Sequence, residues 1–227
     1  MPHSRANAWR VAQKPYPQNQ PAYSVAEAAR YLTLPASTLR SWTLGRFWIL
    51  KRRSRSGLPA LSFWNLIEAH VMRSLRAERG VSLKAVREAV DYAERIERID
   101  RLLLSKELRT HAGKLFLDKY GQLIDLPASG QLAMRMLFEE HLKRVEWDEW
   151  KFPVRLYPFV SGDTRAIRTI AIDPSIAFGR PVVARAGVST GAIAGRIDAN
   201  EPVQEVADDY DLTVEEVEQA VLYERAA

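Results

Sequence analysis

The chain has 227 residues and is 47% hydrophobic, a composition ordinary for a folded protein of one or two domains. It contains no cysteine, which excludes a disulfide framework and a thiolate metal site. The formal net charge is +5 but is unevenly placed: residues 1–60 carry ten Lys/Arg and one acid, whereas residues 188–227 carry ten Asp/Glu and two arginines. The two ends are therefore expected to bind different partners.

The amino-terminal residues show no targeting or membrane pattern. No apolar run approaches the roughly 18 residues that a membrane span requires, and residues 1–22 have no hydrophobic stretch typical of a secretory signal. We expect a cytoplasmic protein with no membrane partner. Prolines among Gln, Asn and Ser in residues 1–22 predict a flexible arm, because this composition buries too little surface to offset the entropy of ordering.

The stretch "YSVAEAARYLTLPASTLRSW", residues 23–42, predicts two short helices around a turn. Ser24 and Glu27 have the spacing of a capping box at the start of the first helix. Pro35 suits the first position of the second helix, because its missing N–H would be unpaired there in any residue. Leu39 and Trp42 then lie on the buried face of the second helix.

The other face of the second helix is small and polar. Such side chains can contact phosphates or base edges when a recognition helix enters a major groove. The predicted DNA contacts on this helix are Ser37, Thr38, Arg40 and Ser41. The same spacing is typical of a helical hairpin inside a core, so the pattern alone leaves both interpretations open.

The basic segment "GRFWILKRRSRSGLPALSF" follows the second helix. Its apolar residues 47–50 resemble one strand of a small wing, and cations around such a strand contact phosphate. The predicted contacts are Arg46, Lys51, Arg52, Arg53 and Arg55. A merely solvated loop would mix charges of both signs, as the rest of the chain does, so we favour a double-stranded DNA partner.

Two longer helices are predicted next, in "FWNLIEAHVMRSLRAERG" and "SLKAVREAVDYAERIERIDRLL", separated by Gly80. The apolar residues of the second are Leu83, Val86, Val90, Tyr92 and Ile96. A helix-turn-helix, a basic wing and a helix pair, over residues 23–98, resemble the MerR-like winged helix domain, with "LPASTLRSW" similar to its recognition helix. The long dimerising coiled coil of full MerR regulators is not evident.

Residues 99–165 are predicted to form a small α+β connector. "KLFLDKYGQLIDL" gives two apolar runs around Gly121 and predicts a β-hairpin, and "SGQLAMRMLFEEHLKRVEW" predicts a helix. "VRLYPFV" and "AIRTIAI" are rich in β-branched and aromatic residues and are expected to pair as a second hairpin. The expected fold class is thus mainly α with small β elements (α+β).

The C-terminal residues 166–227 carry the most specific pattern. Its fixed elements are Asp173-Pro174, Gly179-Arg180-Pro181, Gly187, Ala220 and Tyr223. At this spacing they resemble the domain-of-unknown-function 433 family over about residues 167–224. The sequence departs from the family at "RAGVS", where Gly-Thr-Arg is more common.

Three short helices are predicted in this segment, from about Thr190, from Pro202 and after Thr213, where Glu216 completes a second capping box. The last two helices have a helix-turn-helix outline, but acids at the recognition positions would be repelled by phosphate. We therefore predict a trihelical protein-binding unit, the alternative being an acidic solvated face without a partner. The candidate contacts are Arg180, Asp208, Asp209, Asp211, Glu215, Glu216 and Glu218.

The 433 family resembles the VapB-like antitoxins of type II toxin–antitoxin pairs, whose partners are PIN-like ribonucleases. The resemblance implies an antitoxin that autorepresses its operon at operator DNA and neutralises a PIN-like toxin. A homodimer is expected, because two-fold operators suit helix-turn-helix dimers. The alternatives are a stand-alone MerR-like transcriptional regulator that senses a small ligand in the connector, and a scaffold protein with no DNA role.

An enzyme requires a constellation of reactive side chains, and the sequence contains none that is recognisable. The four histidines, His3, His70, His111 and His141, are far apart and have no metal-ligand spacing. Neither a phosphate-cradling Gly-rich loop nor a Gly-flanked nucleophilic serine is present. We expect no catalytic residue, no metal and no cofactor.

Overall fold

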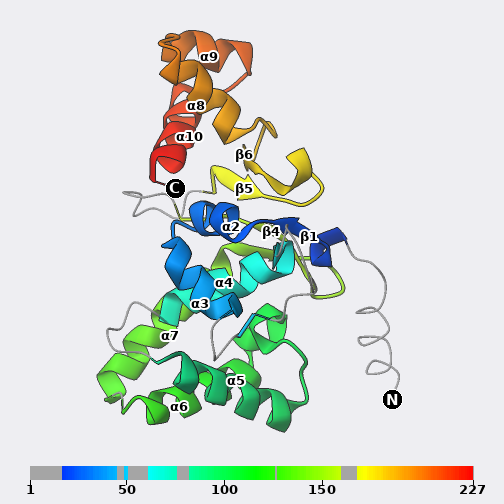
Figure 1. Cartoon of the computed structure of the whole chain (residues 1–227), viewed down its shortest axis with the longest axis vertical. Helices are drawn as coiled ribbons and strands as arrows, with labels where there is room; N and C mark the ends of the chain where they lie inside the picture. The colour runs from blue at the N-terminus through cyan, green and yellow to red at the C-terminus, as the bar shows by residue number, and fades with distance from the viewer. Residues whose placement is uncertain are drawn as a thin grey trace.

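The computed structural model describes residues 17–44, 49–50, 61–75, 82–125, 127–159 and 168–226. Within them the chain is mainly helical with two small antiparallel sheets, one of two strands and one of four. The expected α+β class is therefore confirmed. Figure 1 shows α8, α9 and α10 at one end, α5 and α6 at the other, and α2, α3 and α4 between them.

The elements up to the connector are η1 (Pro17–Asn19), β1 (Pro21–Tyr23), α2 (Val25–Tyr31), α3 (Ala36–Leu44), β2 (Leu61–Ser62), α4 (Phe63–Leu75) and α5 (Leu83–Glu97). The connector contains η2 (Leu102–Leu104), η3 (Lys106–Arg109), α6 (His111–Leu123), α7 (Ala128–Lys143), β3 (Val145–Trp147) and β4 (Pro153–Leu156). The C-terminal elements are β5 (Ile170–Ile172), η4 (Ala177–Gly179), β6 (Pro181–Val183), α8 (Thr190–Asp198), α9 (Val203–Asp209) and α10 (Val214–Ala226).

The helix pair α2 and α3 forms as predicted. The Ser24 hydroxyl accepts from the Glu27 N–H, and the Glu27 carboxylate accepts from the Ser24 N–H, so the capping box is present. Pro35 lies just before α3, where its carbonyl accepts the first helical hydrogen bonds. Leu39 and Trp42 are fully buried and anchor α3 in the core.

The predicted flexible arm is wrong in its last part. Residues 17–23 form η1 and β1, and β1 pairs antiparallel with β2. The cause is a long-range contact: the Arg101 guanidinium donates to the Asn19 side chain at 3.2 Å while it also bonds both carboxylate oxygens of the buried Glu68, at 2.8 and 2.9 Å. Residues 1–16 lie outside the described part of the chain.

The hairpin predicted around Gly121 is also wrong, because this stretch is helix α6. The buried residues Phe116, Leu117 and Tyr120 follow a helical period along it. Gly121, which was predicted to lie in a turn, instead packs closely: a Cβ there would lie 3.1 Å from the Gln131 side chain, and one on Gly113 of the same helix would overlap the Leu108 carbonyl. Both are therefore packing positions.

The sheet β3-β4-β5-β6 joins the connector to the C-terminal segment. The predicted pairing of the two strands on either side of residues 160–167 is confirmed by the Leu156–Ile172 register of β4 and β5. Asp173 at the end of β5 accepts from Arg155 of β4 at 2.9 Å and from the Ser175 N–H at 2.8 Å. The Asp-Pro motif thus fixes the turn that follows β5.

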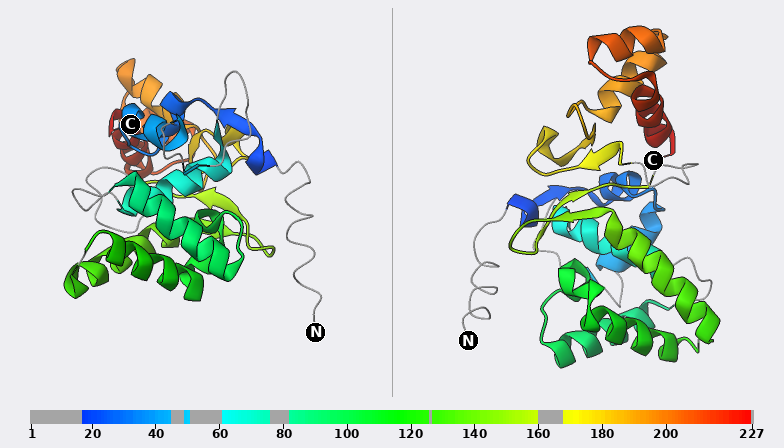
Figure 2. Two further views of the ribbon diagram at one scale, coloured as in Figure 1. Left: turned by 60° about the horizontal axis from the view of Figure 1, so that its bottom comes forward. Right: turned by 180° about the vertical axis from the view of Figure 1, so that it is seen from behind.

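The hydrophobic core divides at this sheet. One cluster runs from Tyr23 through α2–α7 to Ile172, and a second is built by α8, α9 and α10 on Ile170 and Val183. Ile96, expected among the apolar residues of its helix, is 57% exposed, since α5 buries Val86, Ala89, Val90 and Ala93 instead. Figure 2 shows the C-terminal helices standing apart from the helical body on this sheet.

Two histidines described above as far apart are in contact. The His70 and His141 rings lie 4.9 Å apart, and the His70 Nε2–H donates to the His141 carbonyl oxygen at 2.9 Å. The Phe159 ring packs against both, with the guanidinium groups of Arg73 and Arg144 over it. Burial, reinforced by these two cations, lowers the pKa of His70 and lowers that of His141 to about 4.

This histidine pair predicts loss of stability in mild acid. An unfolded histidine binds a proton near pH 6.5, but folded His141 does so only near pH 4, so within this window the unfolded state binds more protons. The free energy of unfolding should therefore fall as pH drops from 6.5 to 4, by about 3 kcal/mol for His141 alone. Urea unfolding at pH 7, 5.5 and 4 measures it.

The matched variants for this test are His141→Gln and His111→Gln. Carboxylates also titrate in the lower part of the window. The effect of His141 is therefore read from the difference in pH dependence between each variant and the wild type. His141→Gln should flatten the pH dependence, whereas His111→Gln, whose side chain is 76% exposed, is the control for loss of an imidazole outside the buried pair. Parallel slopes for His141→Gln and wild type would contradict the assignment.

Candidate nucleic-acid and partner-binding surfaces

Helix α3 carries the described part of the candidate DNA surface. Ser37 and Arg40 are exposed and Thr38 and Ser41 are half-buried, so the four predicted contacts share the face opposite Leu39 and Trp42. The Ser41 hydroxyl donates to the Thr38 carbonyl at 2.7 Å and is engaged within the helix. Arg40 is the charged residue of Ala36–Leu44, so α3 by itself offers phosphate one cation.

The basic segment predicted as a wing falls outside the described residues. Arg46, Lys51, Arg52, Arg53 and Arg55 belong to residues 45–48 and 51–60. Of the expected wing strand, Ile49 and Leu50 are described: both are buried, and both N–H groups bond to the Trp42 carbonyl at 3.0 and 3.3 Å. Ile49 and Leu50 are thus tied to the last turn of α3, and the phosphate contacts stay a prediction.

The C-terminal acids divide into two groups. Asp209 pairs with Arg196 at 2.6 Å, and Glu216 pairs with Arg185 at 3.0 Å while it caps α10 through the Thr213 N–H at 2.9 Å. The Arg185 hydrogen bond lowers the pKa of Glu216. Asp211 lies 3.6 Å from Arg185. These three predicted partner contacts are thus engaged in ion pairs within the C-terminal segment.

The remaining acids are open to a partner. Glu215 and Glu218 are exposed and form no ion pair with a residue that the structure describes. Asp208 is exposed and accepts from the Gln204 amide at 2.8 Å. The exposed acids Asp208 of α9 and Glu215 and Glu218 of α10 are together called the acidic face.

Arg180 does not lie with the acids. It is exposed, it follows η4, and it is electrostatically coupled to Glu27 and Tyr31 of α2. The Ser24 hydrogen bonds lower the pKa of Glu27, with smaller contributions from Arg30 and Arg180. The predicted partner-binding set is thus split between the acidic face and the turn after β5.

A seam between α2 and the C-terminal segment was not predicted from the sequence. The buried Tyr223 hydroxyl donates to the Tyr31 carbonyl at 2.8 Å, and Arg30 lies 3.4 Å from Glu224. The Tyr23 hydroxyl donates to the Gly179 carbonyl at 3.1 Å. Burial raises the pKa of Tyr223 and of Tyr23, so both hydroxyls keep their protons and remain donors. Tyr223 was recognised as a motif residue, but its partner is 192 positions away.

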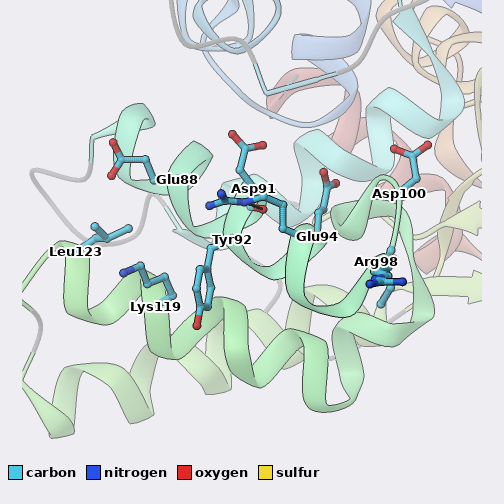
Figure 3. Close-up of a pocket in the computed structure, with 10 residues that line it drawn as sticks. Glu88, Asp91, Tyr92, Glu94, Arg98, Asp100, Lys119 and Leu123 are labelled. Atoms are coloured by element: carbon cyan, nitrogen blue, oxygen red, sulfur yellow. Dashed lines mark hydrogen bonds between the residues drawn. The ribbon is translucent and has the colours of Figure 1, made fainter.

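An open groove of about 830 Å³ lies between α5 and α6. Figure 3 shows acids and cations facing one another across it, with Lys119 beside the Tyr92 ring, 5.3 Å from its centroid. Glu94 on its wall accepts from the Leu102 N–H at 2.9 Å and so has a structural role. No group of three or more His, Asp or Glu side chains in the described ranges could hold a metal ion.

The described helices include none that is long and apolar enough to cross a membrane.

Comparisons with known proteins relate first the C-terminal segment, and then most of the chain, to other sequences and structures. Residues 170–223 match the DUF433 family model. That model is described as a protein of unknown function. The DUF433 segment runs from β5 into α10, so the resemblance seen in the C-terminal sequence is confirmed.

A relative covers nearly the whole chain. The chain is 27% identical to a Mycobacterium tuberculosis protein named "Putative antitoxin VapB45", with 88% of this chain and 92% of that protein aligned. The structure is also similar to the crystal structure of Rv2018 from Mycobacterium tuberculosis, with a TM-score of 0.73 and 24% identity over 89% of this chain and 98% of that one. The second comparison shows a shared fold, and the first shows a sequence relative along most of both chains.

The seam predicts unequal effects for two glycines of the DUF433 segment. Gly179 and Gly187 both have positive φ, +76° and +70°, so alanine should cost about 1 kcal/mol at either one through backbone strain. A Cβ on Gly179 would also collide with the Tyr23 hydroxyl, whereas one on Gly187 would lie 3.6 Å from Ile176. Gly179→Ala should therefore cost about 1–3 kcal/mol more than Gly187→Ala in urea unfolding.

Tyr23→Phe provides the double-mutant test of this contact. It removes the colliding oxygen, so Gly179→Ala should be less destabilising in the Tyr23→Phe background than in the wild type. Equal costs for the two glycine variants, or additive effects of Gly179→Ala and Tyr23→Phe, would show that the hydroxyl does not pack against this turn.

Proposed function

We propose that this chain is the antitoxin of a type II toxin–antitoxin system. In this proposal its C-terminal segment binds and neutralises a PIN-like ribonuclease, and its amino-terminal region binds operator DNA and represses its own operon. The observation that carries the proposal is the similarity to VapB45 along nearly the full length of both chains. The DUF433 match supports it for the C-terminal segment.

The DNA-binding part of the proposal is supported by α3 and by charge. The face that holds Ser37 and Arg40 is free of core contacts, and residues 1–60 carry a net charge of +9. Cations close to α3 would attract the phosphate backbone, while its short polar side chains can approach base edges. Two copies of the chain would fit a two-fold operator, so the active species is proposed to be a homodimer.

The toxin-binding part is supported by the opposite end. Residues 188–227 carry a net charge of −8, and Glu215, Glu218 and Asp208 remain exposed after the internal ion pairs are formed. An enzyme that cleaves RNA needs a cationic surface to hold its substrate. An acidic protein face can occupy that surface, which blocks RNA and neutralises the enzyme.

Co-expression tests the function directly. The product of the neighbouring gene in the operon should arrest growth when expressed alone, and this chain should restore growth and co-purify with it. The purified chain should also bind its own promoter duplex. If the neighbouring product neither binds this chain nor affects growth while promoter binding persists, the regulator interpretation replaces the antitoxin.

The DNA surface predicts two distinct variant effects. Changing Arg52, Arg53 and Arg55 to alanine removes phosphate contacts, so affinity should fall for all sequences and the slope of log K against log salt should decrease by up to about three. Arg40→Ala should instead reduce the preference for operator over unrelated duplex, by about 1–3 kcal/mol if Arg40 contacts a base. Fluorescence anisotropy at several salt concentrations separates the two.

A charge-matched control comes from the α5–α6 end of the molecule. Arg95, Lys106 and Lys114 are exposed cations of the α5–α6 region, so their triple alanine variant loses the same charge. It should keep the wild-type salt slope. A wing variant that binds as tightly as wild type at every salt concentration would refute the proposed phosphate contacts.

The acidic face predicts a loss of toxin affinity on charge reversal. Glu215→Lys with Glu218→Lys should weaken binding at least about 10-fold, because both side chains are exposed and would meet the toxin's cations. Glu216 is left unchanged, since it holds Arg185 and caps α10. Calorimetric titration at low and moderate salt measures the change.

Glu139→Lys with Glu149→Lys makes the same charge change on exposed residues of the connector. This control should bind the toxin as the wild type does. Equal losses for both double variants would mean that net charge, not the α9–α10 face, determines affinity.

A further inference from the structure

The turn η4 exposes a large aromatic side chain. Phe178 is 93% exposed, compared with 66% for Trp150 and 62% for Met136, the next most exposed large apolar side chains of the described residues. Exposed aromatics are unfavourable in water, and Phe, together with Arg, is enriched at the centres of protein interfaces. Phe178 is followed by the exposed Arg180.

The backbone of this turn holds Phe178 outward. Ala177, Phe178 and Gly179 have φ of 47°, 56° and 76°, a left-handed run that residues with a Cβ adopt only at an energetic cost. The run is retained because its ends are fixed: the Gly179 N–H bonds to Ile176 at 2.9 Å, and the Gly179 carbonyl accepts from Tyr23 at 3.1 Å. The exposed position of Phe178 is thus built into the fold.

The turn is continuous with the loop that leads to the acidic face. Ile176 and Ala184 pack on the same small cluster of Tyr157, Ala171 and Val182. A Cβ on Gly187 would lie 3.6 Å from Ile176. The same loop carries Arg185, which pairs with Glu216 at 3.0 Å. The Phe178 turn and the first turn of α10 are thus connected through Ile176, Gly187 and Arg185, and we treat these residues as one candidate surface.

We propose that Phe178 is the apolar anchor of this surface and inserts into an apolar cavity of a protein partner that also offers a cationic patch to α9 and α10. The acids beside the loop favour a cationic protein over nucleic acid, because a polyanion would be repelled there. The inference rests on the proposed antitoxin function, in which the toxin is this partner. The inference adds an apolar contact, made by Phe178, to the charged contacts of the acidic face.

Affinity for the neighbouring gene product tests the anchor with the full-length chain. Phe178→Ala should weaken binding by about 30-fold or more, as truncation of a central aromatic does. Its melting temperature should stay at the wild-type value, since the side chain contributes little buried area. Wild-type affinity for Phe178→Ala would overturn the inference and leave the antitoxin function standing.

Trp150→Ala is the matched control. It also removes an exposed aromatic, but from the turn between β3 and β4, so it should change affinity by no more than about two-fold. Equal weakening by Trp150→Ala and Phe178→Ala would indicate a nonspecific apolar effect and would also overturn the inference.

Photo-crosslinking tests the Phe178 contact without assuming that the partner is a toxin. A benzoylphenylalanine placed at position 178 of the full-length chain should give, in the native cells, an adduct with one protein, whose affinity for Phe178→Ala is then measured in the same way. If the crosslinked protein is not a nuclease but binds Phe178→Ala more weakly than the wild type, the anchor is supported and the toxin assignment is refuted. Adducts with nucleic acid, with a second copy of this chain, or with nothing would overturn the anchor.

Discussion

The buried hydrogen bond from the Tyr223 hydroxyl to the Tyr31 carbonyl ties the last helix to the first helix of the helix-turn-helix pair. A buried tyrosine hydroxyl needs an acceptor, and the carbonyl near the end of α2 provides one. Tyr23 and Gly179 form a second tie at the other end of α2. Because these contacts hold the C-terminal segment against α2, the acidic face and α3 have defined positions relative to each other.

In that arrangement the acidic face and α3 lie on different parts of the molecule. Figure 1 places α9 at the far end from α5, with α3 on the side of the seam away from the C-terminal helices. Acids near α3 would weaken phosphate binding, and cations near α10 would weaken contact with a cationic protein. Internal pairs such as Arg196 with Asp209 further reduce repulsion within the acidic segment. This placement would let the two partners proposed above bind at separate sites of one chain.

Local signals were the most predictive. Both capping boxes and the buried face of α3 follow from spacing within one or two turns, and the DUF433 motif identified the C-terminal unit. Contacts between distant residues were missed, since nothing in the sequence pairs His70 with His141 or Arg101 with Asn19. Gly121 of α6 was mistaken for a turn residue, because close helix packing and turns both favour glycine. Phe178 was overlooked because nothing in the local sequence signals its positive φ or its exposure.

The shared sheet has a consequence for the modularity of the DUF433 segment. The matched residues begin at β5. The side of β5 that faces away from β6 is paired in this chain with β4 from the connector. A polypeptide holding the matched residues alone would leave that side of β5 with unpaired main-chain groups, which attract another strand. The segment is therefore suited to accept a foreign strand by edge addition wherever it occurs without such a connector.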